Sequence, residues 1–156
     1  MPVWCLEFFA LGITVCCQSL FAQQSEFYLG VPTEKIERVM DLGYNLDPST
    51  AGLIDEITDS YPDSPLGPCL NAARLFRLDG YAGGTDEELA KQFEKASEDA
   101  IEVAKDYYSD NESDPTARYA LAMCELNLAR YYIENGRWLG GFFKANSGLA
   151  HLKGIL

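Results

Sequence analysis

The chain has 156 residues, which fits a single domain able to bury a core without disulfide bonds. It carries 24 Asp and Glu against 12 Lys and Arg, a net charge of −12. Nucleic acids and anionic membranes attract clustered Lys and Arg, and the sequence has no such cluster, so its composition argues against both partners. An acidic surface is typical of a small protein kept soluble after export, and it would also attract a basic partner.

The first 22 residues form the most apolar segment of the sequence. Residues 3–21 carry Glu7 as their only charge, and the small residue Ala22 follows them. This pattern predicts a secretory signal peptide over 1–22, cleaved after Ala22, and hence an exported protein in the periplasm or at the cell surface. Two alternatives stay open: an uncleaved anchor helix, for which the stretch is barely long enough, and a lipoprotein signal at Cys16, where Val15 replaces the usual small residue.

The remaining chain, 23–156, is predicted to be a single domain of about six helices. Pro and Gly fall in the gaps between apolar periodic segments, and no segment alternates strictly, so no sheet is expected. The expected helices cover about 33–42, the segment between Pro48 and Tyr61, 66–79, 86–108, 115–135 and 139–156. The fifth is apolar on nearly all sides, which places it in the middle of the stack. The sixth is expected to turn four side chains inward: Phe142, Ala145, Leu149 and Leu152.

An internal repeat indicates how these helices are organised. Residues 70–80 read LNAARLFRLDG and residues 126–136 read LNLARYYIENG, identical at five of eleven positions. A repeated two-helix unit cannot bury its apolar face alone, so successive units must stack.

The second copy of this repeat carries small, aromatic and glycine residues in a characteristic order: Leu128, Ala129, Tyr132, Gly136, Trp138, Gly141, Ala145 and Gly148. In this order the chain resembles the tetratricopeptide-repeat family, and in its arrangement it looks like uncharacterised exported bacterial repeat proteins. The resemblance implies an all-α solenoid of stacked antiparallel helical hairpins, with 33–61 as a degenerate repeat. Solenoids need a polar terminal repeat, and the sequence ends without one. We therefore expect the N-terminal part of a longer solenoid or, alternatively, an end that packs on a partner.

Residues suited to catalysis or metal binding are scarce. His151 is the only histidine, and beside Leu149 and Leu152 it is expected to be a packing residue. Cys-x-x-Cys pairs, paired histidines and a phosphate-binding loop are missing from the sequence. The acids at 86–88 fit the first turn of a helix, and those at 110–114 lack the glycine and distal glutamate of a calcium loop. We expect no catalytic residue, no metal site, no cofactor and no enzyme activity.

The repeat instead points to a binding surface, because it pairs Asn71 with Asn127 and Arg74 with Arg130. In the resembled family, the asparagine at this place in the first helix often faces the concave groove and holds a peptide backbone or carboxylate. This implies a non-catalytic scaffold for a protein or peptide partner. Each of the two helices would present an amide and a guanidinium that suit a carboxylate of the partner. Alternatively, both arginines pair with acids of neighbouring helices. Rival functions are an accessory component of envelope assembly or substrate transport, and a small helical lyase or hydrolase.

Two cysteines, Cys69 and Cys124, remain after removal of the predicted signal peptide. Both lie on apolar helical faces, which favours two buried thiols. In an oxidising compartment they would instead pair if their Cα atoms lay within about 7 Å.

Overall fold

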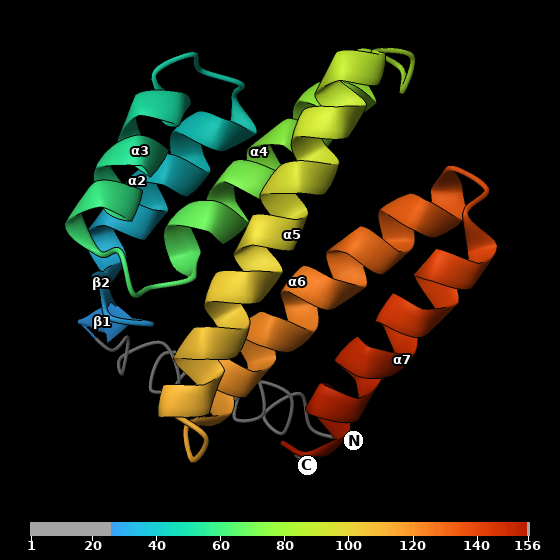
Figure 1. The fold of residues 1–156 in the computed structure, drawn as a ribbon. Coiled ribbons are helices and arrows are strands. Elements are labelled where there is room, and N and C mark those ends of the chain that lie inside the picture. The colour runs from blue at the N-terminus through green and yellow to red at the C-terminus, as the bar shows by residue number, and fades with distance from the viewer. Residues whose placement is uncertain (1–25, 156) are drawn as a thin grey trace, which may run out of the picture.

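A computed structural model of the chain describes residues 26–155, in which six helices follow a short hairpin (Figure 1). The elements are β1 Phe27–Tyr28, β2 Val31–Pro32, α2 Thr33–Tyr44, α3 Thr50–Ser60, α4 Leu66–Tyr81, α5 Glu87–Asp110, α6 Pro115–Glu134 and α7 Trp138–Lys153. Each predicted helix is present, which confirms the all-α class. The predicted signal peptide lies outside the described residues.

The hairpin of β1 and β2 corrects the prediction that the chain contains no sheet. Its strands pair antiparallel, with Tyr28 opposite Val31, and the turn between them places Leu29 and Gly30 at φ 50° and 81°. Left-handed φ values at both turn residues suit a tight hairpin. Val31 is fully buried, and the Ser64 hydroxyl donates a 2.8 Å hydrogen bond to the Leu29 carbonyl. Strands of two residues are too short to show alternation, so the sequence pattern could not reveal them.

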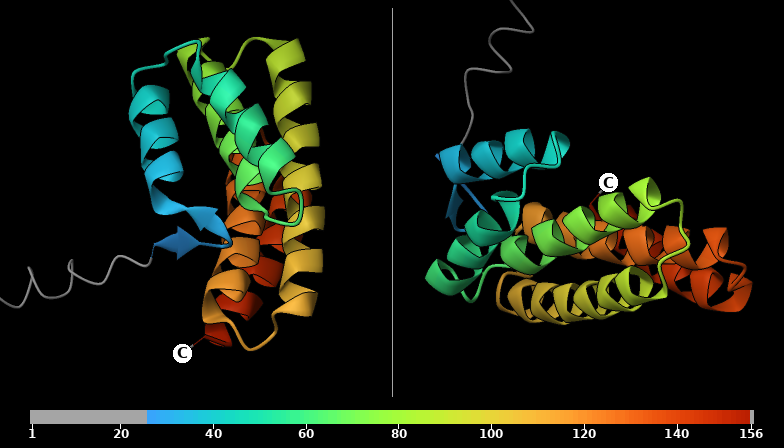
Figure 2. Two further views of the ribbon diagram at one scale, coloured as in Figure 1. Left: turned by 90° about the vertical axis from the view of Figure 1, so that its left-hand side faces the viewer. Right: turned by 90° about the horizontal axis from the view of Figure 1, so that it is seen from above.

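The helices form antiparallel neighbours along the chain, arranged as α2/α3, α4/α5 and α6/α7 (Figures 1 and 2). The larger apolar core lies between α4, α5 and α6, and a second core joins the hairpin, α2 and α3 to the start of α4 and to Ala120 of α6. Helix α6 packs against both α5 and α7, as its all-round apolar pattern predicted. In Figure 1, α5 and α6 lie together at the bottom and diverge toward the top.

Local sequence explains where the two longest helices begin. Asp86 caps α5, since its carboxylate accepts hydrogen bonds from the backbone N–H groups of Glu88 and Leu89. Asp114 caps α6 in the same way, and Pro115 follows it as the first helical residue. Both arrangements satisfy N–H groups that a helix start leaves without partners. The acids at 86–88 therefore belong to a helix start, as the sequence predicted.

Helix α7 corrects the expectation about its inward face. Phe142 is 60% exposed and Leu149 is 46% exposed, whereas Gly141 and Gly148 are buried against α6. A Cβ atom at Gly148 would lie 2.8 Å from Leu126 Cγ and 3.0 Å from the Ala122 carbonyl oxygen. The two helices thus approach through glycine, which turns the large apolar side chains of α7 outward.

This close approach predicts that Gly148→Ala lowers the free energy of unfolding by a net of about 0.5–2 kcal/mol. Overpacking of the interface by the added methyl group costs about 1–3 kcal/mol, and the helix preference of alanine offsets about 0.5–1 kcal/mol of this cost. Gly52→Ala is the matched control, since nothing lies within 4 Å of a Cβ built at that exposed helical position. The control should raise stability by about 0.5–1 kcal/mol, because alanine favours a helix over glycine. Urea denaturation followed by circular dichroism measures both, and equal shifts for the two variants would contradict the proposed packing.

Candidate binding cleft

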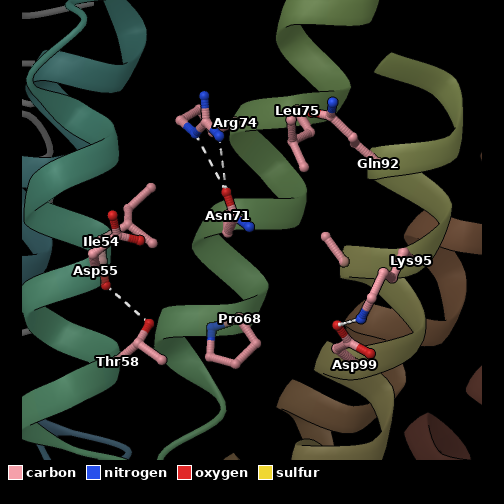
Figure 3. Close-up of a pocket in the computed structure, with 11 residues that line it drawn as sticks. Ile54, Asp55, Thr58, Pro68, Asn71, Arg74, Leu75, Gln92, Lys95 and Asp99 are labelled. Atoms are coloured by element: carbon pink, nitrogen blue, oxygen red, sulfur yellow. Dashed lines mark hydrogen bonds and ion pairs between the residues drawn. The ribbon is translucent and has the colours of Figure 1, made fainter. Parts of the chain in front are cut away.

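A polar cleft lies between α3, α4 and α5, and we call it the Arg74 cleft (Figure 3). Its cavity volume is about 410 Å³, within the range of ligand sites. Its polar lining comes from Asp55, Thr58, Asn71, Arg74, Gln92, Lys95 and Asp99. Residues three or four apart share one face of a helix. Helix α4 therefore presents Asn71 and Arg74 to the cleft, and α5 presents Gln92, Lys95 and Asp99.

Arg74 is the central cation of this cleft. Its Nη2 and Nε donate to Asn71 Oδ1 at 3.1 and 3.4 Å, so the asparagine holds one edge of the guanidinium (Figure 3). Within residues 26–155, no carboxylate lies within 4.0 Å of this half-buried group. Lys95 on the other wall differs, because its ammonium binds Asp99 at 2.6 Å and this hydrogen bond raises the pKa of Lys95. The cleft therefore holds one cation with a carboxylate partner and one without.

The other predicted pair, Asn127 and Arg130, lies in a separate cavity of about 130 Å³ between α4 and α6. Both residues are exposed. Arg130 binds Glu134 of its own helix at 2.7 Å and stacks 5.4 Å from the ring centroid of Phe76. The structure thus keeps each predicted pair together but divides the four residues between two cavities. Among the described residues, neither arginine pairs with an acid of a neighbouring helix, so the alternative of two such ion pairs is wrong.

Sequence reasoning missed the contribution of α5 to the Arg74 cleft. Gln92, Lys95 and Asp99 belong to a polar stripe that looks like an ordinary solvent-facing surface. Only the packing of α5 across α4 shows that this stripe faces Asn71. Their spacing places all three on one helical face, which was the available signal. Sequence reasoning also missed Arg77, which lines the cavity of Asn127 and Arg130. Its guanidinium lies 5.8 Å from the ring centroid of Tyr44 on α2.

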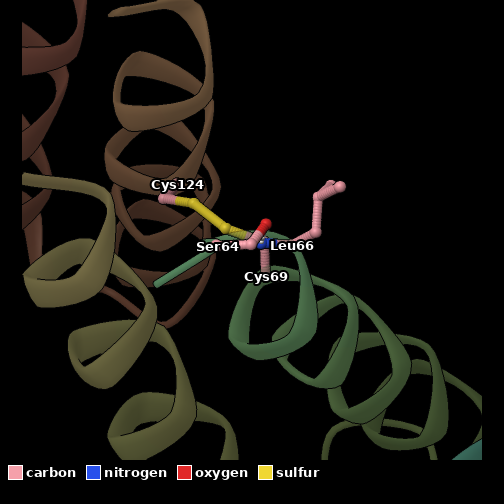
Figure 4. The surroundings of a disulfide bond; sticks show 4 residues. All are labelled: Ser64, Leu66, Cys69 and Cys124. Atoms are coloured by element: carbon pink, nitrogen blue, oxygen red, sulfur yellow. Dashed lines mark hydrogen bonds between the residues drawn. A yellow bond between two sulfur atoms is a disulfide. The ribbon is translucent and has the colours of Figure 1, made fainter. Parts of the chain in front are cut away.

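Helices α4 and α6 are covalently joined, because Cys69 and Cys124 form a disulfide bond (Figure 4). Their Cα atoms are 6.6 Å apart. The expectation of two buried thiols is therefore wrong. An apolar helical face indicates burial of each cysteine. The proximity of the two depends on how α4 and α6 lie relative to each other, and the pattern of one helix does not contain this information.

The surroundings of His151 bear on the rival hydrolase function. Its ring packs edge-on against Tyr108 at 5.8 Å, and its Nε2 lies 3.9 Å from Glu125 Oε2. Ser147 Oγ donates to the other oxygen of Glu125 at 2.9 Å. A hydrolytic triad needs the histidine between the hydroxyl and the carboxylate, so that the histidine can take the hydroxyl proton. Here the carboxylate lies between them, and the three residues do not form that arrangement.

Across residues 26–155, no group of three metal-binding side chains comes together. No helix in this range is long and apolar enough to cross a membrane. Comparison with protein-family models, curated proteins and solved structures gives no match. The function must therefore be argued from the geometry of the site.

Proposed function

We propose that the chain is a non-catalytic binding scaffold that holds a carboxylate of a protein or peptide partner in the Arg74 cleft. The observation that carries this proposal is the guanidinium of Arg74, which is half-buried and has no carboxylate partner among the described residues. The chain has twice as many acids as bases, so an intramolecular partner would be easy to supply. A guanidinium kept without one is suited to an external carboxylate.

The hydrogen bonds of Arg74 define how such a carboxylate would bind. Asn71 Oδ1 accepts from Nε and Nη2, which leaves the outer edge of the fork for two parallel bonds to a carboxylate. Because the asparagine orients the fork in advance, binding costs less conformational entropy. Asp55 on the wall formed by α3 can accept a hydrogen bond from a peptide N–H group. The lining therefore suits a peptide end or an acidic side chain with its adjoining backbone.

The disulfide supports the further proposal that the chain is exported, because stable disulfides are typical of oxidising compartments. The periplasm and the cell surface both meet this condition. An exported scaffold of tetratricopeptide type would account for the oxidising compartment, the helical hairpins and the predicted signal peptide together.

Arg74→Gln is expected to weaken carboxylate binding about 10- to 100-fold, because hydrogen bonds to charged groups contribute about 1.5–3 kcal/mol. The probe is acetyl-Ala-Glu-Ala with a free C-terminus, titrated into ¹⁵N-labelled full-length chain while amide shifts at residues 71, 74 and 92 are followed. Arg130→Gln is the matched control, since Glu134 already neutralises that arginine. If both variants weaken binding equally, the carboxylate does not bind specifically in the Arg74 cleft. If neither does, the carboxylate proposal is wrong.

A further inference from the structure

Another cavity lies where the α4–α5 loop faces the end of α6, in the region where α5 and α6 diverge in Figure 1. Its volume is about 460 Å³, and we call it the Asp79 cavity. Its lining includes Phe76, Asp79, Gly83, Gly84, Tyr131 and Glu134. The Arg74 cleft shares none of its lining residues, so the two cavities can be tested separately.

Asp79 is the unusual residue of this cavity, because it is a charged side chain with only 7% of its surface exposed. Its Oδ1 is buried and has no hydrogen-bond partner among residues 26–155. No ion pair or side-chain hydrogen bond involves Asp79 in this range. Burying a carboxylate without donors is costly, and native structures rarely do so without a reason.

Two arginines, one on α6 and one in the turn after it, are paired with acids other than Asp79. Arg130 binds Glu134 at 2.7 Å, and Arg137 binds Glu94 at 2.5 Å. Each of these pairs is neutral, so the charge of Asp79 remains uncompensated. Burial, and then the negative charge of Asp79, raise the pKa of the Tyr131 phenol. The cavity therefore combines a net negative charge with oxygen acceptors.

The rest of the lining suits the apolar stem of a cationic side chain. Phe76 and Tyr131 supply aromatic rings, and Phe93 supports both from behind, with ring centroids 5.5 and 4.5 Å away. Gly83 and Gly84 have φ values of 77° and 68°, which favour glycine, and nothing lies within 4 Å of a Cβ built at either. The two glycines carry no side chains that could fill this side of the cavity.

We propose that the Asp79 cavity binds a lysine side chain of a protein partner, with Asp79 as the counter-ion of the ammonium group. A single uncompensated carboxylate matches one positive charge, and the ammonium has three donors for acceptors spread around it. The Phe76 and Tyr131 rings of the lining can cover the methylene stem of the lysine. A divalent metal fits less well, because hard cations need several oxygen ligands and no group of three metal-binding side chains occurs in residues 26–155.

The test uses Nα-acetyl-lysine methylamide, with a free side-chain ammonium group, as the probe. Nα-acetyl-norleucine methylamide is its uncharged counterpart, and each is titrated into the ¹⁵N-labelled full-length chain. The lysine probe is expected to shift the amides of Gly83, Gly84 and Tyr131, and the norleucine probe is not. If the lysine probe shifts none of these amides, or if both probes shift them equally, the proposal is overturned. This comparison needs no substitution, so it does not depend on the folding of any variant.

Asp79→Asn is expected to weaken binding of the lysine probe by about tenfold or more, because it removes the charge and keeps the shape. Asp110→Asn makes the same charge change at an exposed position and should leave binding unchanged. Arg74→Gln should also leave it unchanged, which separates this site from the Arg74 cleft. Equal binding by Asp79→Asn and the wild-type chain would overturn the proposal. A lower unfolding midpoint in Asp79→Asn would also overturn it, because the fold would then need the carboxylate.

Discussion

Reducing the Cys69–Cys124 disulfide is expected to lower the free energy of unfolding by about 4 kcal/mol. The two cysteines are separated by 55 positions, and chain-entropy estimates for a closed loop of this length give about that value. Small domains are stable by only about 5–15 kcal/mol, so this bond would supply a large share of the total. Urea denaturation of the oxidised and reduced chain, monitored by circular dichroism, measures the difference.

The control for reduction is the double variant Cys69→Ala with Cys124→Ala, in which the reductant should change nothing. Thiol titration of the unfolded wild-type chain should find two more thiols after reduction than before. Equal unfolding midpoints with and without reductant would contradict a stabilising disulfide. The bond joins the first helices of the two repeated units, so its loss is also expected to loosen the position of α4, which carries Asn71 and Arg74.

The helices were predictable because each is encoded by nearby residues. Apolar spacing and acids at helix starts are properties of single segments, and they placed all six helices to within a few residues. Glycine was a weaker signal, because α2 and α4 continue through Gly43 and Gly80. The hairpin, the disulfide and the outward face of α7 were not predictable in this way. Each depends on how two distant segments approach, as when Gly148 lets α7 lie directly on α6. Periodicity identifies the apolar side of a helix. It does not show whether a side with glycines will face the neighbouring helix instead.

The candidate sites also combine features that nearby residues encode with features that depend on packing between helices. The internal repeat identified Asn71 and Arg74, and the structure brings them together because they lie one turn apart on α4. The same repeat aligns Asp79 with Asn135, and both line the Asp79 cavity. That alignment was an available signal. However, an acid just before a glycine at a helix end is ordinarily exposed, and only the packing of α6 against α4 shows that Asp79 is buried.

Phe93→Ala is expected to lower the free energy of unfolding by about 3–5 kcal/mol, the usual cost of truncating a buried phenylalanine. Phe93 is 1% exposed, and its ring contacts both Phe76 and Tyr131 in the larger core. Phe142→Ala removes the same ring from the exposed face of α7 and should change stability by no more than about 0.5 kcal/mol. Thermal unfolding of both variants gives the comparison, and similar losses would show that the two rings are equally buried.

The same substitution connects stability with binding, because the rings that Phe93 supports are walls of the Asp79 cavity. A void behind Phe76 and Tyr131 frees both rings to move inward, away from the position that would cover a lysine stem. Phe93→Ala should therefore weaken the lysine probe even at temperatures where the variant stays folded, whereas Phe142→Ala should not. Unchanged lysine affinity in folded Phe93→Ala would mean that the aromatic walls contribute little, and that the charge of Asp79 alone accounts for binding.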